Sequence, residues 1–228
     1  DLSEGYDIRL AMPYSSFDYI VHFAALRSIP LGEISPKNFI ETNCWGTVNL
    51  MRTYPSGRFI NISSNSATDV RSIYGATKQF TESEVSTRQD YLNIRLHNVF
   101  GEGMSLLNGT LISNLIRCKM GSQAPTIYGD GLQERDFTYV RDVVESILDL
   151  MLNGCVGLYH VGYGSSISVL QLLESIYGYL PERLHKESRG FEIVDSQSPM
   201  GIPVVYGRQE GLRRTVEWHL TKTTSKNS

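Results

Sequence analysis

The chain has 228 residues, of which 41% are hydrophobic and 20% are charged, as in an ordinary soluble globular protein. A formal net charge of -3 gives no basis for binding nucleic acid or an anionic membrane. No apolar run approaches the roughly 18 residues needed to span a bilayer. The three cysteines lie far apart without C-x-x-C spacing, which predicts reduced thiols, no metal and a cytoplasmic protein.

Apolar runs of strand length alternate with stretches of helical periodicity in the first half of the chain. Strands are predicted at residues 17–23, 59–62 and 92–99, and helices at residues 38–53 and 74–88. Strands that alternate with helices argue for a parallel, doubly wound sheet with right-handed crossovers. We therefore predict an α/β fold.

The second half continues with shorter elements of both kinds. Helices are predicted at residues 110–120, 140–152, 169–177 and 210–220, and strands at residues 126–128 and 158–161. Ser168 is a candidate N-cap for the helix at 169–177. The polar residues 221–228 are expected to form a disordered tail.

A tyrosine and a lysine lie four residues apart in the run Tyr74-Gly-Ala-Thr-Lys78. In a helix the two side chains share one face, and the ammonium lowers the pKa of the phenol from about 10 toward neutrality. A phenol with such a pKa can serve as a general acid or base. Because Tyr-x-x-x-Lys also occurs by chance, a surface pair on a helix is the alternative interpretation.

A buried strand is predicted directly before this helix, in the run Arg58-Phe-Ile-Asn-Ile62. It would deliver Ser63 and Ser64 to its carboxyl end, where ligands bind in open α/β sheets. A serine hydroxyl there could hydrogen-bond the same substrate oxygen as Tyr74. The set of serine, tyrosine and lysine therefore indicates proton transfer while an alcohol is oxidised or a ketone is reduced.

Several motifs along almost the whole chain occur together. They are His22-Phe-Ala-Ala-Leu26, Asn43-Cys-Trp-Gly-Thr47, Ser63-Ser64 with Tyr74 and Lys78, Arg95-Leu-His-Asn98-Val-Phe-Gly, and Gly211-Leu-Arg-Arg-Thr-Val-Glu-Trp218. The most specific is Gly129-Asp-Gly-Leu-Gln-Glu-Arg135-Asp-Phe-Thr-Tyr-Val-Arg-Asp142-Val. The set resembles the extended short-chain dehydrogenase/reductases, in particular the NAD-dependent nucleotide-sugar epimerases and dehydratases.

The resemblance implies roles for individual residues. Ser64, Tyr74 and Lys78 would be catalytic, with Tyr74 exchanging a proton with a sugar hydroxyl. The residues implied in binding the cofactor, NAD rather than NADP, are Asp1, Leu2, Ala24, Ala25, Leu26, Asn43, Ser63, Tyr74 and Lys78. Those implied in binding a nucleoside-diphosphate sugar are Arg27, Asn98, Thr110, Leu111, Thr126, Tyr128, Arg135 and Arg189. Asn98 and Arg135 would take the diphosphate, since a guanidinium fork suits phosphate oxygens.

The resemblance also implies a domain organisation. A Rossmann-like doubly wound parallel sheet would carry a small C-terminal α/β substrate-binding lobe. Residues 1–103 would form a partial NAD-binding domain with the catalytic set. Residues 104–220 would form mainly the sugar-nucleotide lobe, with a strand returning to the sheet near 158–161. The family often dimerises through two helices, here at about 38–53 and 74–88, so a homodimer is an expectation.

The sequence departs from the family pattern at its beginning. Neither G-x-x-G-x-x-G nor G-x-G-x-x-G occurs, so the first βαβ unit, whose turn holds a pyrophosphate, is expected to be absent. Either the chain is a fragment or a truncated product, or the natural protein has lost dinucleotide binding. Without that unit, the strand at 17–23 would be an apolar edge that promotes self-association.

A second departure lies in the serine loop. Only nine residues separate Ser64 from Tyr74, so Ser63 or Ser66 could take the place of Ser64. The loop also lacks the Asp-Glu pair of the 4,6-dehydratases, and elimination of water needs that extra acid and base. We therefore expect an epimerase that acts through a keto intermediate. A reductase or dehydratase of the same family and a non-catalytic nucleotide-sugar-binding module are the alternatives.

Overall fold

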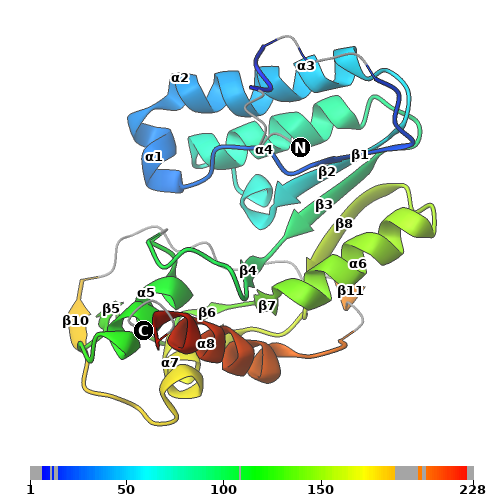
Figure 1. The fold of residues 1–228 in the computed structure, drawn as a ribbon. Helices are drawn as coiled ribbons and strands as arrows, with labels where there is room; N and C mark the ends of the chain where they lie inside the picture. Colours follow the sequence, from blue (N-terminus) through cyan, green and yellow to red (C-terminus); the bar gives the residue numbers. More distant parts are fainter. Residues whose placement is uncertain are drawn as a thin grey trace. The chain divides into compact units, whose positions relative to one another are not determined.

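The computed structural model describes residues 7–10, 12, 15–107, 109–187, 200–201 and 204–224 (Figure 1). The chain forms two compact units. One comprises Asp1–Leu96 and Ile147–His160, and the other comprises His97–Ser146 and Val161–Ser228. The division after Leu96 precedes the domain boundary expected at residue 103.

The first unit is built on a parallel sheet. Its strands in sheet order are β1 (Tyr19–His22), β2 (Arg58–Ser64), β3 (Leu92–Leu96) and β8 (Gly157–Gly162), whose last two residues belong to the second unit. The pairings of β1 with β2 and of β2 with β3 are parallel, and Ser64 lies opposite Leu96. The predicted Rossmann-like parallel sheet is confirmed.

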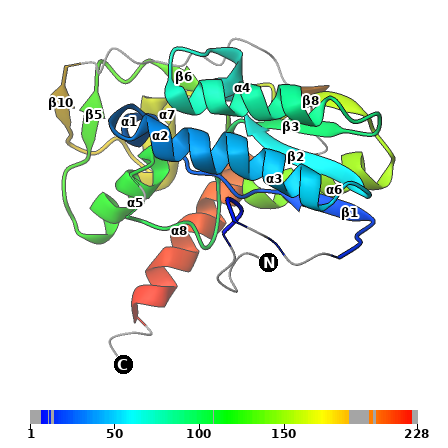
Figure 2. The ribbon, with the colours of Figure 1, turned by 90° about the horizontal axis from the view of Figure 1, so that it is seen from above.

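Helices cover one face of this sheet (Figures 1 and 2). They are α2 (Pro36–Phe39), the π-helix η2 (Ile40–Trp45), α3 (Gly46–Thr53) and α4 (Ile73–Val85). A short helix, α1 (Ile29–Ile34), precedes them, and the 3₁₀ helix η3 (Asn65–Thr68) connects β2 to α4. The single helix predicted at 38–53 is therefore part of three consecutive helical segments. Leu50, Tyr54, Phe59 and Val85 form the core beneath them.

The edge strand β1 exposes apolar side chains. Tyr19 and Val21 are exposed, whereas Ile20 between them packs into the core. Within the described part of the chain β1 pairs with β2 alone, so its other edge carries backbone groups without a strand partner. This is the edge predicted from the sequence, and self-association through it stays a prediction.

The second unit contains short strands in pairs. These are β4 (Asn98–Phe100) with β7 (Phe137–Tyr139), β5 (Thr126–Tyr128) with β10 (Leu184–Lys186), and β6 (Glu134–Arg135) with β9 (Ile167–Ser168), the last pair antiparallel. In addition, β11 (Met200–Gly201) pairs with Val161 and Gly162 of β8. The strand predicted at 92–99 is divided at His97, because its first part joins the sheet of the first unit and its last part becomes β4.

Helices complete the second unit. They are α5 (Leu111–Met120), the beginning of α6 (Val140–Leu152), α7 (Val169–Tyr177) and α8 (Arg208–Thr224). Ser168 caps α7 as predicted, with Gln171 N donating to its Oγ at 3.1 Å. Helix α8 continues four residues into the predicted tail, and residues 225–228 lie outside the described residues. None of the described helices is long and apolar enough to cross a membrane.

A glycine sets the contact between α8 and β7. A Cβ atom at Gly211 would lie 2.5 Å from Cγ of Tyr139, closer than real side chains approach. Tyr139 is fully buried in a core that also contains Phe100, Leu115 and Leu212. The glycine of the Gly211–Trp218 motif is therefore explained by close packing of a helix on an aromatic ring.

Candidate functional site

Ser64 and Tyr74, both predicted to be catalytic, lie near enough for the Ser64 hydroxyl to lower the pKa of the Tyr74 phenol. Ser64 is the last residue of β2, and Tyr74 is the second residue of α4. Ser64 Oγ also accepts a hydrogen bond from Ser66 N at 3.2 Å, which caps η3. The Ser63 hydroxyl points elsewhere, since it donates to Glu82 Oε1. Of these two neighbouring serines, Ser64 is therefore the one whose hydroxyl acts on the tyrosine.

The short connection between Ser64 and Tyr74 is possible because η3 packs closely on α4. A Cβ atom at Gly75 would lie 2.4 Å from the carbonyl oxygen of Ser66 and 2.8 Å from that of Asp69. Ser72 caps the helix, because Gly75 N donates to its Oγ at 3.0 Å. A nine-residue connection is therefore long enough to place Ser64 against Tyr74, since Gly75 leaves room for the backbone of the loop.

Lys78 is held one helical turn after Tyr74. Its Nζ donates to the carbonyl oxygen of Ile62 at 2.8 Å, and the residue is only 7% exposed. Burial lowers the pKa of Lys78 to about 8, while the Glu82 carboxylate acts in the opposite direction. An ammonium carries three N–H donors. The described contacts use one of them, so two are available for a ligand.

The pKa of Tyr74 departs from the direction predicted from the sequence. Burial raises the pKa of the phenol above its ordinary value of 10, and the Ser64 hydrogen bond and the Arg27 guanidinium oppose this rise only in part. The prediction considered the charge of Lys78 and left out the desolvation of the phenol, which is the larger effect here. Arg27, predicted to bind substrate, therefore lies where its charge favours the phenolate.

Asn43 connects the segment after β1 to α4. Its side chain accepts from Leu26 N at 2.7 Å and donates to Leu26 O at 3.0 Å and to Thr77 Oγ1 at 3.0 Å. The Asn43 amide therefore links the segment after β1 to α4, and in this way it supports the neighbouring site residues. Ala24 and Ala25 line an apolar groove of ≈ 580 Å³ beside β1.

The predicted substrate residues that the structure describes lie in the second unit, apart from Arg27. Asn98 begins β4, and its Nδ2 donates to the carbonyl oxygen of Asp136 at 3.1 Å. Arg135 belongs to β6 and lies opposite Ile167 of β9. Asn98 is therefore brought to the residue that follows Arg135. Thr126 and Tyr128 are the first and last residues of β5. Thr110 is the N-cap of α5, and Leu111 is the first residue of that helix. Arg189, Asp1 and Leu2 lie outside the described residues.

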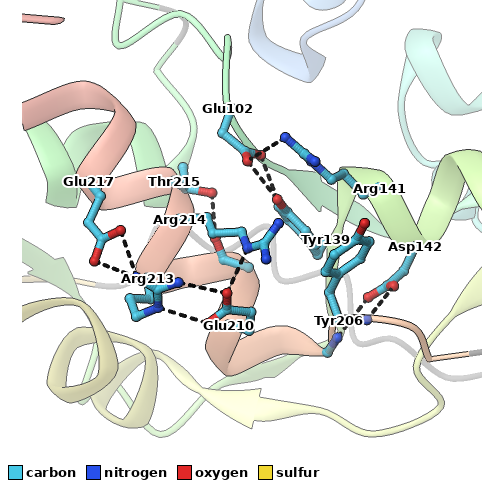
Figure 3. A network of polar contacts seen from close by, with 12 residues as sticks. Glu102, Tyr139, Arg141, Asp142, Tyr206, Glu210, Arg213, Arg214, Thr215 and Glu217 are labelled. Atoms are coloured by element: carbon cyan, nitrogen blue, oxygen red, sulfur yellow. Dashed lines mark hydrogen bonds and ion pairs between the residues drawn. The ribbon is translucent and has the colours of Figure 1, made fainter. Parts of the chain in front are cut away.

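An aspartate of the long motif anchors the chain before α8. Asp142 Oδ1 accepts from Val205 N at 3.0 Å and from Tyr206 N at 2.9 Å, and its Oδ2 accepts from Gly207 N at 3.0 Å (Figure 3). The Tyr163 hydroxyl donates to the same carboxylate at 2.5 Å. Asp142 is fully buried, so these four donors replace the water that its charge would otherwise bind.

A second motif aspartate, Asp136, forms an ion pair that the sequence did not reveal. Arg208 Nη2 lies 3.1 Å from Asp136 Oδ1, with side chains 12% and 2% exposed. Gly164 N donates to Asp136 Oδ2 at 2.8 Å, and Arg208 Nε donates to Phe137 O at 2.9 Å. The two partners are 72 residues apart, and no motif spacing connects them.

Tyr139 is fully buried, and its surroundings keep it neutral. Its hydroxyl donates to Glu102 Oε1 at 2.7 Å, and Arg141 pairs with the same carboxylate (Figure 3). Burial and the Glu102 carboxylate raise the pKa of Tyr139 to about 12. Its described contacts therefore suit a structural role in the second unit.

Residues 1–162 match the sequence profile of the NAD dependent epimerase/dehydratase family. The chain belongs to this family. Among its relatives, the dTDP-D-glucose 4,6-dehydratase of Mus musculus is 25% identical, with 96% of this chain and 72% of the relative covered. A putative UDP-glucose 4-epimerase of Methanocaldococcus jannaschii is also 25% identical, over 93% of this chain and 80% of the relative.

A solved structure shows the same fold. The UDP-glucose 4-epimerase of Thermotoga maritima, crystallised with UDP-glucose, superposes with a TM-score of 0.79 at 24% identity. The superposition covers 90% of this chain and 78% of the epimerase. The resemblance of the motifs to nucleotide-sugar epimerases and dehydratases is thus confirmed at the level of family and fold.

The family's dinucleotide suits the residues around Lys78. Two N–H donors of a buried ammonium are available for ribose hydroxyls, near the hydroxyls of Ser64 and Tyr74 at the carboxyl end of β2. The given sequence contains no glycine-rich turn for a pyrophosphate. The residues of this member of the NAD dependent epimerase/dehydratase family therefore fit the nicotinamide-ribose end of NAD. No metal-binding group of three His, Cys, Asp or Glu occurs in the described ranges.

Proposed function

We propose that this protein is an NAD-dependent nucleotide-sugar epimerase, which oxidises and re-reduces one sugar hydroxyl carbon through a keto intermediate. The observation that carries the proposal is the nearness of the Ser64 hydroxyl to the Tyr74 phenol at the carboxyl end of β2, with the buried Lys78 ammonium one helical turn away. Relatives named as nucleotide-sugar epimerases and dehydratases support the substrate class.

In this proposal Tyr74 is the general base and acid. Its phenolate accepts the proton of the sugar hydroxyl during oxidation, and the resulting phenol returns that proton to the keto oxygen during reduction. Ser64 donates a hydrogen bond to the same substrate oxygen. Bound NAD supplies the hydride acceptor and donor. Because burial raises the pKa of Tyr74, the phenolate depends on the Ser64 hydroxyl and on the positive charge of Arg27. To these the proposal adds the Lys78 ammonium one helical turn away.

Lys78 holds the ribose of the dinucleotide through the two N–H donors that Ile62 does not use. Its lowered pKa, about 8, keeps the group protonated near neutral pH. The ammonium therefore positions the cofactor and favours the phenolate at the same time.

The sugar nucleotide is bound by residues of the second unit in this proposal. Asn98 and Arg135 take the diphosphate, and Thr110, Leu111, Thr126 and Tyr128 line the nucleotide pocket. Support comes from the Asn98–Asp136 hydrogen bond, which holds Asn98 beside the residue that follows Arg135. Homodimerisation through α2, α3 and α4 stays a prediction.

Dehydration is the second candidate, because one relative is named as a 4,6-dehydratase. Elimination of water needs an extra acid and base near the reacting hydroxyl. Between Ser64 and Tyr74 the chain has a single carboxylate, Asp69, and Arg71 Nε donates to it at 2.6 Å. A paired carboxylate is poorly suited to proton transfer, so epimerisation is favoured.

The test is incubation of each of UDP-, dTDP- and GDP-hexoses with NAD and, in parallel, with NADH or NADPH, followed by mass and configuration analysis of the products. An epimerase gives a product of unchanged mass and changed configuration without net NADH formation. Net consumption of NAD(P)H indicates a reductase, and loss of the mass of water indicates a dehydratase. Calorimetric binding of the sugar nucleotide without NAD binding or turnover would support a non-catalytic module and overturn the proposal.

A further inference from the structure

Glu82 presents a buried carboxylate that the proposed mechanism does not use. The residue is 7% exposed and lies one helical turn after Lys78 on α4. Arg95 binds it with two parallel hydrogen bonds, from Nε to Oε1 at 2.8 Å and from Nη2 to Oε2 at 2.6 Å. Ser63 Oγ donates to Oε1 at 2.5 Å. Bidentate pairs of this kind are among the strongest polar contacts in proteins.

These contacts connect β2, β3 and α4 next to the candidate site. Ser63 of β2 and Arg95 of β3 are register partners in the parallel sheet, and Glu82 of α4 bonds both. Ser63 is followed directly by Ser64. A displacement of the Glu82 carboxylate therefore moves the backbone that carries the Ser64 hydroxyl.

A further set of buried hydrogen bonds secures the same turn of α4. Asn93 Nδ2 donates to the carbonyl oxygen of Glu82 at 3.0 Å, and Asn61 Nδ2 donates to Asn93 Oδ1 at 2.8 Å. Thr81 Oγ1 donates to the carbonyl oxygen of Lys78 at 2.8 Å. Buried polar groups are costly unless they are paired, so this network fixes one register of the helix against the sheet.

We propose that Glu82 and Arg95 are a positioning pair, which fixes the Ser64 hydroxyl and the Lys78 ammonium relative to Tyr74. The inference rests on the proposed function for its effect on turnover. Its effect on the surroundings of Lys78 holds whether or not the protein turns over a sugar. Neither residue touches the substrate in this arrangement, and both act through their neighbours.

The charges around Lys78 give the pair an electrostatic effect as well. Glu82 raises the pKa of Lys78 against the lowering caused by burial. His22 of β1 also faces Lys78, but burial lowers its pKa to about 3, so it is uncharged near neutral pH. Arg95 offsets part of the Glu82 charge from β3. Removal of the carboxylate is therefore expected to lower the pKa of Lys78 further.

The test is Glu82→Gln, which keeps the shape of the side chain and removes its charge. The pKa of Lys78 should fall below the wild-type value, read from an NMR titration of ¹³C-labelled lysine in which Lys78→Met identifies the signal. A misplacement of about 1 Å in a catalytic group can cost about 100-fold in rate, so we expect a 10- to 100-fold fall in kcat. KM for the sugar nucleotide should stay unchanged.

Glu84→Gln is the matched control, because it removes the same charge from the same helix two residues later, outside the network. If Glu82→Gln does not fold, Arg95→Lys keeps the charge but loses the bidentate geometry, and its kcat should fall with KM unchanged. A folded Glu82→Gln protein that matches Glu84→Gln in kcat and in the Lys78 titration would overturn the inference. If the wild type has no turnover, the proposed function fails and the Lys78 titration still decides the positioning role.

Discussion

Lys78 Nζ and the carbonyl oxygen of Ile62 lie 2.8 Å apart, so the ammonium of α4 is bonded to the backbone of β2. The lysine is buried, and its pKa is lowered from the ordinary 10.5 to about 8. Between these two pH values the unfolded chain binds more protons than the folded one. The free energy of unfolding therefore rises with pH across this window.

Replacement of Lys78 should remove its contribution to the pH dependence of the unfolding free energy. We expect the difference in unfolding free energy between the wild type and Lys78→Met to change by about 1 kcal/mol for each pH unit between 8 and 10, in favour of the wild type at higher pH. Urea denaturation at a series of pH values measures it. Lys37→Met, at a side chain that is 84% exposed, is the control and should follow the wild-type curve. Parallel curves for Lys78→Met and the wild type would contradict the burial of the charge.

The phenol of Tyr74 should be essential for turnover and nearly dispensable for binding. Tyr74→Phe removes the proton-transferring group and leaves the ring, so kcat should fall by at least about 100-fold. Calorimetry should give a sugar-nucleotide affinity close to that of the wild type. Tyr179→Phe, at an exposed tyrosine of the second unit, should leave both quantities unchanged. Unchanged turnover in Tyr74→Phe would falsify the proton-transfer role.

The pattern of apolar residues was sufficient to predict most of the fold. The bounds of β5, α6 and α7 match the predicted ranges, because each is followed within two residues by a glycine, and both helices have a clear apolar period. The π-helix η2 was not predicted, since a change from i→i+4 to i→i+5 bonding leaves the apolar residues of the segment the same. Helix α8 was predicted too short because its last turn is polar.

The site was predicted less completely than the fold, for a physical reason. That Ser64, Tyr74 and Lys78 lie in one region could be predicted, because a strand end and a helical spacing place them there, and their catalytic role stays a prediction. The direction of the Tyr74 pKa was missed, because the burial of the phenol depends on tertiary packing that the sequence does not specify. The pairs Glu82–Arg95 and Asp136–Arg208 join distant residues, and a single sequence carries no spacing signal for them.

The Asp136–Arg208 pair should be important for the stability of the second unit. Removal of one partner from a buried ion pair leaves an uncompensated charge, so Arg208→Met should cost about 3–5 kcal/mol in unfolding free energy. The double variant Asp136→Leu/Arg208→Met should cost less than the sum of the single variants. Arg213→Met breaks exposed pairs with Glu210 and Glu217 and should leave the unfolding free energy nearly unchanged. Additive losses in the double variant would show that the two charges do not interact.

The edge of β1 should promote self-association. An exposed apolar edge strand is a template for pairing with another chain, and a lysine on it opposes that pairing. Val21→Lys should therefore reduce the concentration-dependent growth in mass seen by sedimentation velocity. Leu107→Lys is the control, because it adds the same charge at an exposed residue of the second unit. A wild-type protein that stays monomeric at high concentration would contradict the prediction.

Gly75 provides a case in which helix propensity and packing oppose each other. Alanine in a helix interior is favoured over glycine by about 1 kcal/mol, whereas overpacking against fixed atoms costs about 1–3 kcal/mol. The added Cβ would meet the backbone oxygens of Ser66 and Asp69, which cannot turn away as a side chain would. Gly75→Ala should therefore lower the melting temperature and displace η3, so that the Ser64 hydroxyl moves away from Tyr74 and kcat falls. Gly121→Ala, where the nearest atoms are 3.5 Å or more from the added Cβ, should leave the melting temperature unchanged or raise it. A rise in both stability and turnover in Gly75→Ala would show that η3 does not pack against the first turn of α4.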